Sequence, residues 1–116
     1  SQRPLPIVSI LIAIRNEEKD LPRLLKSLEL LDYPVERLEI LIADDQSEDR
    51  TPELLRTWAA HSQNRKIITV LPSQTGLFHP NGKANALSIL AKEAKGDFFF
   101  FTDADCEVPS TWIREG

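Results

Sequence analysis

The sequence is poor in cysteine and glycine, has no methionine, and lacks a long apolar run. Cys106 is the only cysteine among 116 residues, so no disulfide can form within the chain and a site of several cysteine ligands is excluded. No apolar stretch reaches the roughly 20 residues of a transmembrane helix. Lysine and arginine number 14 against 18 acidic residues, which argues against nucleic-acid binding, because neutralising phosphates takes a basic surplus. We therefore expect a soluble chain that suits a reducing compartment such as the cytoplasm.

Strand and helix patterns alternate along the chain. Apolar, β-branched runs predict strands over residues 7–14, 38–43, 66–71 and 97–102. The spacing of leucines predicts a helix over residues 18–31, and a Thr51 N-cap before Pro52 predicts a second helix that begins at residue 51. Two further helices are predicted over residues 83–94 and from residue 110. Residues 72–82 are predicted to be a polar loop. Because parallel strands need helical crossovers, we expect an α/β fold, a Rossmann-like three-layer α/β/α arrangement with a mainly parallel sheet.

Charged residues gather directly after the predicted strands. They are Arg15 and Glu17 after the first strand, Asp44-Asp45 after the second, and Asp103-Ala104-Asp105 after the fourth. In parallel α/β sheets, ligands bind beyond the carboxyl ends of the strands. An acid after a strand also commonly caps a helix or closes a turn, and this interpretation explains Asp44 alone equally well. Together, the three groups predict a ligand site at one edge of the sheet.

The paired acids after the fourth strand indicate a divalent cation. Carboxylates without histidine or cysteine partners favour Mg²⁺ or Mn²⁺, and Asp103 and Asp105 leave coordination positions for water and a ligand phosphate. An anionic diphosphate would be repelled by this acidic edge unless a cation intervened, whereas Arg15 and Lys83 would complement its remaining charge. The sequence thus predicts that the acids and the bases serve one phosphate-bearing ligand.

Four segments in order resemble family 2 of the inverting glycosyltransferases, which use nucleotide sugars and have the GT-A fold. The segments are residues 8–18, 43–49, 82–87 and 102–105, and they span nearly the whole chain. A single acid-x-acid is a weak signal, but four segments at compatible spacing are specific. Gln46 stands where the family often has glycine. The resemblance implies that residues 1–116 are the N-terminal, donor-binding part of a glycosyltransferase domain, and the start at Ser1 rather than methionine indicates a piece excised from a longer chain.

The resemblance also implies roles for individual residues. Ala13 and Arg15 match the turn that lines the nucleobase and ribose, and Asp45 matches an acid that accepts a hydrogen bond from a uracil ring, with Asp44 beside it as support. Lys83 matches a basic position near the diphosphate, Asp105 the principal metal contact and Asp103 its partner. The expected nucleotide-binding set is Ala13, Arg15, Glu17, Asp44, Asp45, Lys83 and Asp103, and the expected metal set is Asp103 and Asp105.

The implied activity is transfer of a sugar from a nucleotide sugar, expected to be a UDP-sugar, to a hydroxyl of a sugar, lipid or polysaccharide acceptor. A divalent cation would stabilise the leaving diphosphate, and the anomeric configuration would invert. In the family the general base lies in a later segment, so we expect it beyond Gly116 and expect this chain alone to be inactive. Many relatives carry membrane helices after the catalytic domain. We therefore expect membrane contact only through parts outside this chain, at the cytoplasmic face.

Three other classes stay open at this stage. A phosphatase or phosphotransferase of the haloacid dehalogenase type also places an acid-x-acid after an apolar strand and uses Mg²⁺, but there the motif comes near the start of the domain. A phosphate-receiving signalling domain would place its lysine after a later strand than its acceptor acid, whereas Lys83 precedes Asp103. The third class is a non-catalytic module that binds a metal or a nucleotide.

Other conspicuous residues are predicted to be structural. The four phenylalanines 98–101 are interpreted as a core strand, because consecutive strand residues alternate between faces. Trp58 and Trp112 are interpreted as packing residues, and Cys106 as a small buried side chain. His61 and His79 are not assigned to the site.

Overall fold

A computed structural model describes residues 4–72 and 82–116 of the chain. Within these ranges the strands and helices alternate as predicted. In chain order they are β1 (Val8–Ile14), α1 (Leu21–Glu29), a 3₁₀ turn (Val35–Arg37), β2 (Leu38–Asp45), α2 (Thr51–Ala59), β3 (Arg65–Val70), α3 (Gly82–Glu93), β4 (Phe98–Phe101) and α4 (Trp112–Glu115). Among these helices, none is long and apolar enough to span a bilayer. Most of the predicted loop 72–82, with His79, lies outside the described residues.

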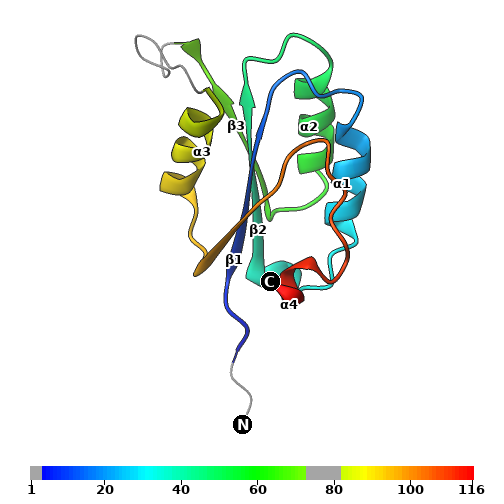
Figure 1. Cartoon of the computed structure of the whole chain (residues 1–116), viewed down its shortest axis with the longest axis vertical. Coiled ribbons are helices and arrows are strands. Elements are labelled where there is room, and N and C mark those ends of the chain that lie inside the picture. Colours follow the sequence, from blue (N-terminus) through cyan, green and yellow to red (C-terminus); the bar gives the residue numbers. More distant parts are fainter. Residues whose placement is uncertain (1–3, 73–81) are drawn as a thin grey trace.

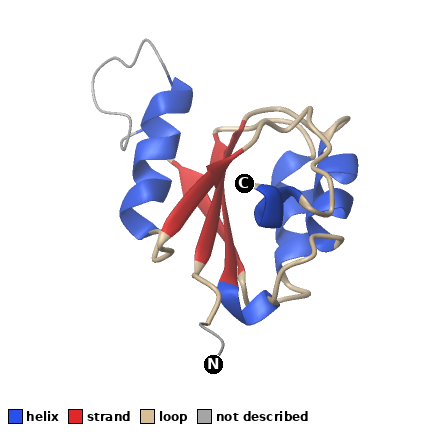
Figure 2. Cartoon of the chain, turned by 60° about the horizontal axis from the view of Figure 1, so that its bottom comes forward, coloured by secondary structure: helices blue, strands red, loops and turns tan. Residues whose placement is uncertain are grey.

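The four strands form one parallel sheet in the order β3-β2-β1-β4. β1 lies between β2 and β4, and the register pairs Ala13 with Ala43 and Leu11 with Phe101. The helices α1, α2 and α4 cover one face, and α3 covers the other (Figures 1 and 2). This is the three-layer, Rossmann-like arrangement that the sequence predicts. Because the strands are parallel, all their carboxyl ends lie at the same edge of the sheet.

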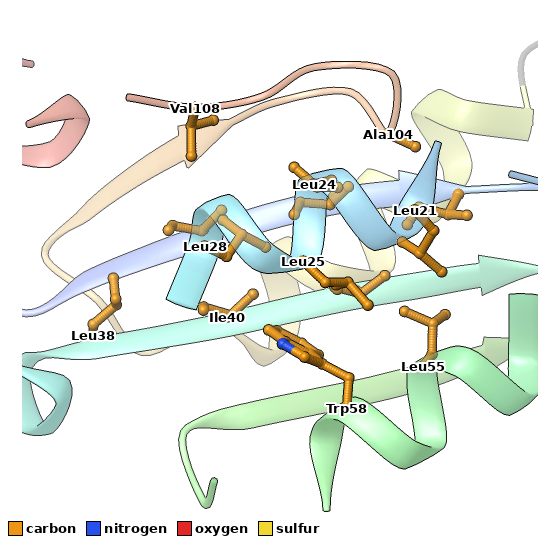
Figure 3. Packing of buried hydrophobic residues seen from close by; sticks show 14 of the residues in the cluster. Leu21, Leu24, Leu25, Leu28, Leu38, Ile40, Leu55, Trp58, Ala104 and Val108 are labelled. Atoms are coloured by element: carbon orange, nitrogen blue, oxygen red, sulfur yellow. The ribbon is translucent and has the colours of Figure 1, made fainter. Parts of the chain in front are cut away.

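Apolar side chains fill both faces of the central strands. Four leucines of α1, at positions 21, 24, 25 and 28, belong to one cluster of buried side chains with Ile40 and Trp58 (Figure 3). On the other face, a smaller cluster joins the sheet to α3; its members are Leu11, Leu41, Ala43, Val70, Ala86 and Leu90. Successive residues along each of β1 and β2 therefore face opposite helix layers. Because both faces are covered, both strands are almost continuously apolar.

The predicted packing roles of the two tryptophans are confirmed. Trp58 is almost fully buried between α2 and the sheet, with the guanidinium of Arg65 4.2 Å from the centre of its ring. Trp112 is half-buried and meets Phe100 edge to face, with 5.2 Å between the ring centres. His61 is exposed, and its Nδ1 lies 2.8 Å from the carbonyl oxygen of Thr57.

The prediction of a phenylalanine core strand is wrong for three of its four residues. Phe98, Phe99 and Phe101 are 58%, 40% and 55% exposed, and only Phe100 packs against the core. The reason is topological: β4 is an edge strand that pairs with β1 alone, and α3 is centred over β1 and β2. An apolar run predicts a strand, but the position of that strand in the sheet decides how much of it is buried.

Two predictions about polar positions are also wrong. Cys106 is exposed, because it lies in the loop after β4, where Ala104 and Val108 fill the core instead.

Thr51 is the first residue of α2 rather than its N-cap, and its hydroxyl accepts a hydrogen bond from the backbone N–H of Glu17, in a different loop. The N–H of Thr51 donates instead to Oδ1 of Asp49 at 2.8 Å, so Asp49 satisfies the first donor of this helix.

Candidate functional site

A cavity of about 440 Å³ opens at the carboxyl edge of the sheet. Its lining comes from the end of β1 and the loop after it, the end of β2, the first turn of α3, and the loop after β4. The residues are Ala13, Ile14, Arg15, Glu17, Asp45, Gly82, Lys83, Asp103, Ala104 and Asp105. The parallel sheet is what brings these distant segments together, since their strands all end at this edge.

The cavity collects the predicted nucleotide and metal residues with one exception, Asp44. Asp44 and Asp45 are neighbours in β2, so their side chains point to opposite faces of the sheet. Asp45 shares the face of Leu41 and Ala43, which α3 covers. Asp44 is on the other face, nearly buried, and its Oδ1 accepts a hydrogen bond from the N–H of Ser47 at 3.2 Å. The structure therefore places Asp44 as a support for the turn after β2, outside the cavity lining.

Asp45 is held close to the start of α3. Its Oδ1 accepts a hydrogen bond from the side-chain amide of Gln46 at 3.2 Å. A Cβ on Gly82 would lie 3.0 Å from Asp45 Oδ2, so a glycine at this position lets α3 approach the carboxylate. Gly82 is absent from the predicted site residues. Its place directly before Lys83, in one of the four family-like segments, is the signal that points to it.

Gln46 adopts a left-handed backbone conformation with φ 61°. Such a conformation costs a residue with a Cβ roughly 1–2 kcal/mol and costs glycine little. Glycine would therefore suit this position, in keeping with the family pattern that the four segments resemble. In this chain, the contact between the Gln46 amide and Asp45 offsets part of that cost.

The loop after β4 presents its two acids outward because the residue between them is anchored. Ala104 is 4% exposed and belongs to the buried cluster that contains the leucines of α1 (Figure 3). Asp103 and Asp105 are both exposed. Oxygen atoms of the two acids and Sγ of Cys106 lie within 4.8 Å of one another. Two carboxylates at this separation, open to solvent, fit a hard divalent cation that keeps water or phosphate oxygens in its remaining positions.

Lys83 is the basic partner of this acidic loop. Its Nζ forms an ion pair with Oδ1 of Asp103, and both side chains are about half exposed. Lys83 stands in the first turn of α3, where a cation opposes the helix dipole, so an anion beside it is favourable. In this structure that anion is the carboxylate of Asp103.

Glu17 adds a further carboxyl group with altered acidity. Burial raises the pKa of Glu17 above its ordinary value of 4.5, and the negative charges of Asp20 and Asp105 raise it further. The cavity is therefore acidic around Glu17 and Asp105, with Lys83 and Arg15 as the basic residues of its lining. A phosphate-bearing ligand would enter this cavity most easily together with a cation.

The fold defines a class: an α/β domain of the GT-A type, with a cavity at the carboxyl edge of its parallel sheet. The chain belongs to glycosyl transferase family 2, whose family profile matches residues 9–115. This assignment confirms the family resemblance of the four segments and does not favour the phosphatase alternative.

Known proteins agree with this assignment. The chain is 37% identical over 112 residues to a beta-monoglucosyldiacylglycerol synthase of Nostoc sp., covering 97% of this chain and 23% of that protein. The crystal structure of S. aureus TarS 1–349 with UDP-GlcNAc matches 93% of this chain and 29% of that one, at TM-score 0.77 and 25% identity. The mannosyltransferase PcManGT of Pyrobaculum calidifontis, in complex with GDP-Man and Mn²⁺, matches 91% and 30%, at TM-score 0.75 and 29% identity. The chain thus spans about a quarter of the length of such relatives.

Proposed function

We propose that this chain is the donor-binding part of a metal-assisted glycosyltransferase that uses a nucleotide sugar. The observation that carries the proposal is the meeting, in one cavity, of Asp45 from β2, Lys83 from α3, and the acid pair from the loop after β4. Proteins of similar fold support it, since one of them is solved with UDP-GlcNAc and another with GDP-Man and Mn²⁺.

We assign the cavity residues according to their chemistry. Ala13 and Arg15 would border the nucleobase and ribose, and the buried carboxylate of Asp45 would accept a hydrogen bond from an N–H of the base. Lys83 would bind the diphosphate, helped by the positive end of the α3 dipole. Asp103 and Asp105 would hold the cation, which would neutralise charge on the leaving diphosphate. We propose a UDP-sugar as donor, on the basis of the family resemblance and the UDP-bound neighbours.

The proposed transfer is a direct displacement at the anomeric carbon. The acceptor oxygen forms a bond to that carbon from the face opposite the nucleotide, and the bond between the carbon and the diphosphate oxygen breaks. The nucleoside diphosphate leaves with the electron pair of the broken bond, and the acceptor proton passes to a general base. Attack from the opposite face inverts the configuration.

We propose that this chain supplies the donor half of that reaction, and that acceptor site and base come from sequence outside it. The cavity lining offers binding and metal-type residues, and the chain spans about a quarter of the relatives it matches. A cytoplasmic location stays a prediction, as does membrane contact through parts outside these residues.

Calorimetry with UDP, GDP and CDP, each with and without Mn²⁺, tests the proposal. We expect one nucleotide to bind only with Mn²⁺ present, and Asp105→Ala to weaken that binding by at least about tenfold, because a carboxylate ligand is lost. Asp32→Ala is the matched control: it removes an exposed carboxylate that pairs with Arg114, outside the cavity. The proposed function fails if no nucleotide binds, or if Asp105→Ala and Asp32→Ala bind as the unaltered chain does.

A further inference from the structure

Three consecutive backbone N–H groups in the loop after β1 donate to side chains in the segment after β2. They are Asn16 N–H to Ser47 Oγ at 2.9 Å, Glu17 N–H to Thr51 Oγ1 at 3.0 Å, and Glu18 N–H to Asp49 Oδ2 at 3.2 Å. The two segments are more than thirty residues apart in sequence. Every N–H from Asn16 to Glu18 therefore donates to a side chain in one other segment, residues 47–51.

A fourth hydrogen bond runs in the opposite direction. The N–H of Glu48 donates to Oδ1 of Asn16 at 2.7 Å. Asn16 has φ 51°, a left-handed conformation that asparagine tolerates better than most residues. This conformation turns the chain between Arg15 and Glu17, two residues of the cavity lining. Asn16 thus bends the loop and also contacts the segment that holds it.

The segment after β2 is itself firmly placed. Thr51 is fully buried at the start of α2, and Asp49 accepts hydrogen bonds from the N–H groups of both Thr51 and Glu18. Desolvation raises the pKa of Asp49, but the hydrogen bonds from Thr51 and Glu18 outweigh it and lower the pKa below its ordinary value. The ionised carboxylate is therefore the form that this network favours.

We propose that Ser47, Asp49 and Thr51, here called the loop clamp, are positioning residues that fix Arg15 and Glu17 as a wall of the nucleotide cavity. None of the three lines the cavity, whereas Arg15 and Glu17 do. The clamp acts through the backbone N–H groups beside these two side chains, so it sets their direction without contacting ligand. The inference rests on the proposed nucleotide site.

The sharpest test is a pair of substitutions at Thr51. Thr51→Val keeps the volume and removes the oxygen that accepts from Glu17 N–H, whereas Thr51→Ser keeps that oxygen. We expect Thr51→Val to speed hydrogen exchange at the Glu17 amide, to shift the NMR signals of Arg15, and to weaken binding of UDP with Mn²⁺ by about tenfold. Thr51→Ser should restore all three toward the values of the unaltered chain.

Ser9→Ala separates positioning from simple loss of stability. Ser9 is also fully buried, and its hydroxyl accepts a hydrogen bond from the N–H of Gly96 at 2.9 Å, near the opposite end of β1 from the cavity. We expect Ser9→Ala to lower the melting temperature in the same way as Thr51→Val while leaving UDP affinity within about twofold. Asn16 is exposed, and glycine tolerates its φ of 51°, so Asn16→Gly removes the acceptor for Glu48 N–H without backbone strain and should weaken UDP binding without unfolding the chain.

The outcomes distinguish this inference from the proposed function. If the unaltered chain binds UDP with Mn²⁺, and Thr51→Val and Asn16→Gly bind it equally well, the clamp has no positioning role and the proposed function stands. Equal losses of affinity in Ser9→Ala and Thr51→Val would also overturn the clamp, because stability alone would then account for both. If the unaltered chain binds no nucleoside diphosphate, the proposed function fails and the inference with it.

Discussion

Lys83 and Asp103 form an ion pair across the cavity, between the first turn of α3 and the loop after β4. They are 20 positions apart in the sequence. In the proposed site these two side chains have different partners, since Asp103 would face a cation and Lys83 a diphosphate. The ammonium group therefore occupies one carboxylate oxygen that the cation would use, and loading the site would exchange one contact for the other.

This exchange predicts that Lys83→Gln changes two affinities in opposite directions. In the unaltered chain the Lys83 ammonium and Mn²⁺ compete for the Asp103 carboxylate. Lys83→Gln removes this competition, so Mn²⁺ alone should bind a few-fold more tightly, in keeping with the small free energy of an exposed ion pair. UDP with Mn²⁺ should bind about tenfold more weakly, because a charge-assisted contact to phosphate is lost. Calorimetry with Mn²⁺ alone and with UDP plus Mn²⁺ measures both.

Lys66→Gln is the matched control for that measurement. Lys66 is an exposed lysine of β3 that pairs with Glu93 at 3.5 Å and does not line the cavity. It should leave both affinities unchanged. If Lys83→Gln moves the two affinities in the same direction, the exchange of partners is wrong.

The left-handed conformation of Gln46 predicts a difference between two small substitutions. Gln46→Ala and Gln46→Gly both remove the amide that contacts Asp45, but only glycine adopts φ 61° without steric cost. Urea unfolding should therefore show Gln46→Gly to be more stable than Gln46→Ala by about 1 kcal/mol, even though glycine loses more entropy on folding. Equal stability of the two variants would mean that the turn relaxes out of the left-handed region.

The raised pKa of Glu17 predicts a pH-dependent gain from Glu17→Gln. Burial, and then the charges of Asp20 and Asp105, lift the folded-state pKa above 4.5. Below pH 4.5 the carboxyl is protonated in both folded and unfolded chains, so the substitution should change little there. As the pH rises through the folded-state pKa, ionisation destabilises the folded chain, and Glu17→Gln avoids that loss. Urea unfolding at pH 4 and pH 7 measures the difference in unfolding free energy between Glu17→Gln and the unaltered chain. If this difference is the same at both pH values, the pKa of Glu17 is not raised in the folded chain.

The layer order of the fold and the edge that carries the site were predictable from local patterns. Apolar runs and leucine spacing report strands and helices, and parallel strands must end at one edge. Acids at the ends of those strands therefore come to one edge, and the family-like segments around Asp45, Lys83 and Asp105 point to residues that line the cavity there. Exposure was not predictable in the same way, because Phe99 and Ile12 stand in equally apolar runs, and only their strands' positions in the sheet distinguish them.

By itself, the sequence determined that this chain builds an α/β sheet with carboxylates after its strands and belongs with the family 2 transferases. Only the tertiary structure decided that Asp44, expected in the nucleotide-binding set together with Asp45, does not line the cavity. Neighbours in a strand point to opposite faces of the sheet, and α3 covers the face of Asp45. It also decided that Thr51 holds the N–H of Glu17 rather than capping its own helix. Such a contact joins segments 34 residues apart, and no local pattern of side chains encodes which distant donor a buried hydroxyl will meet.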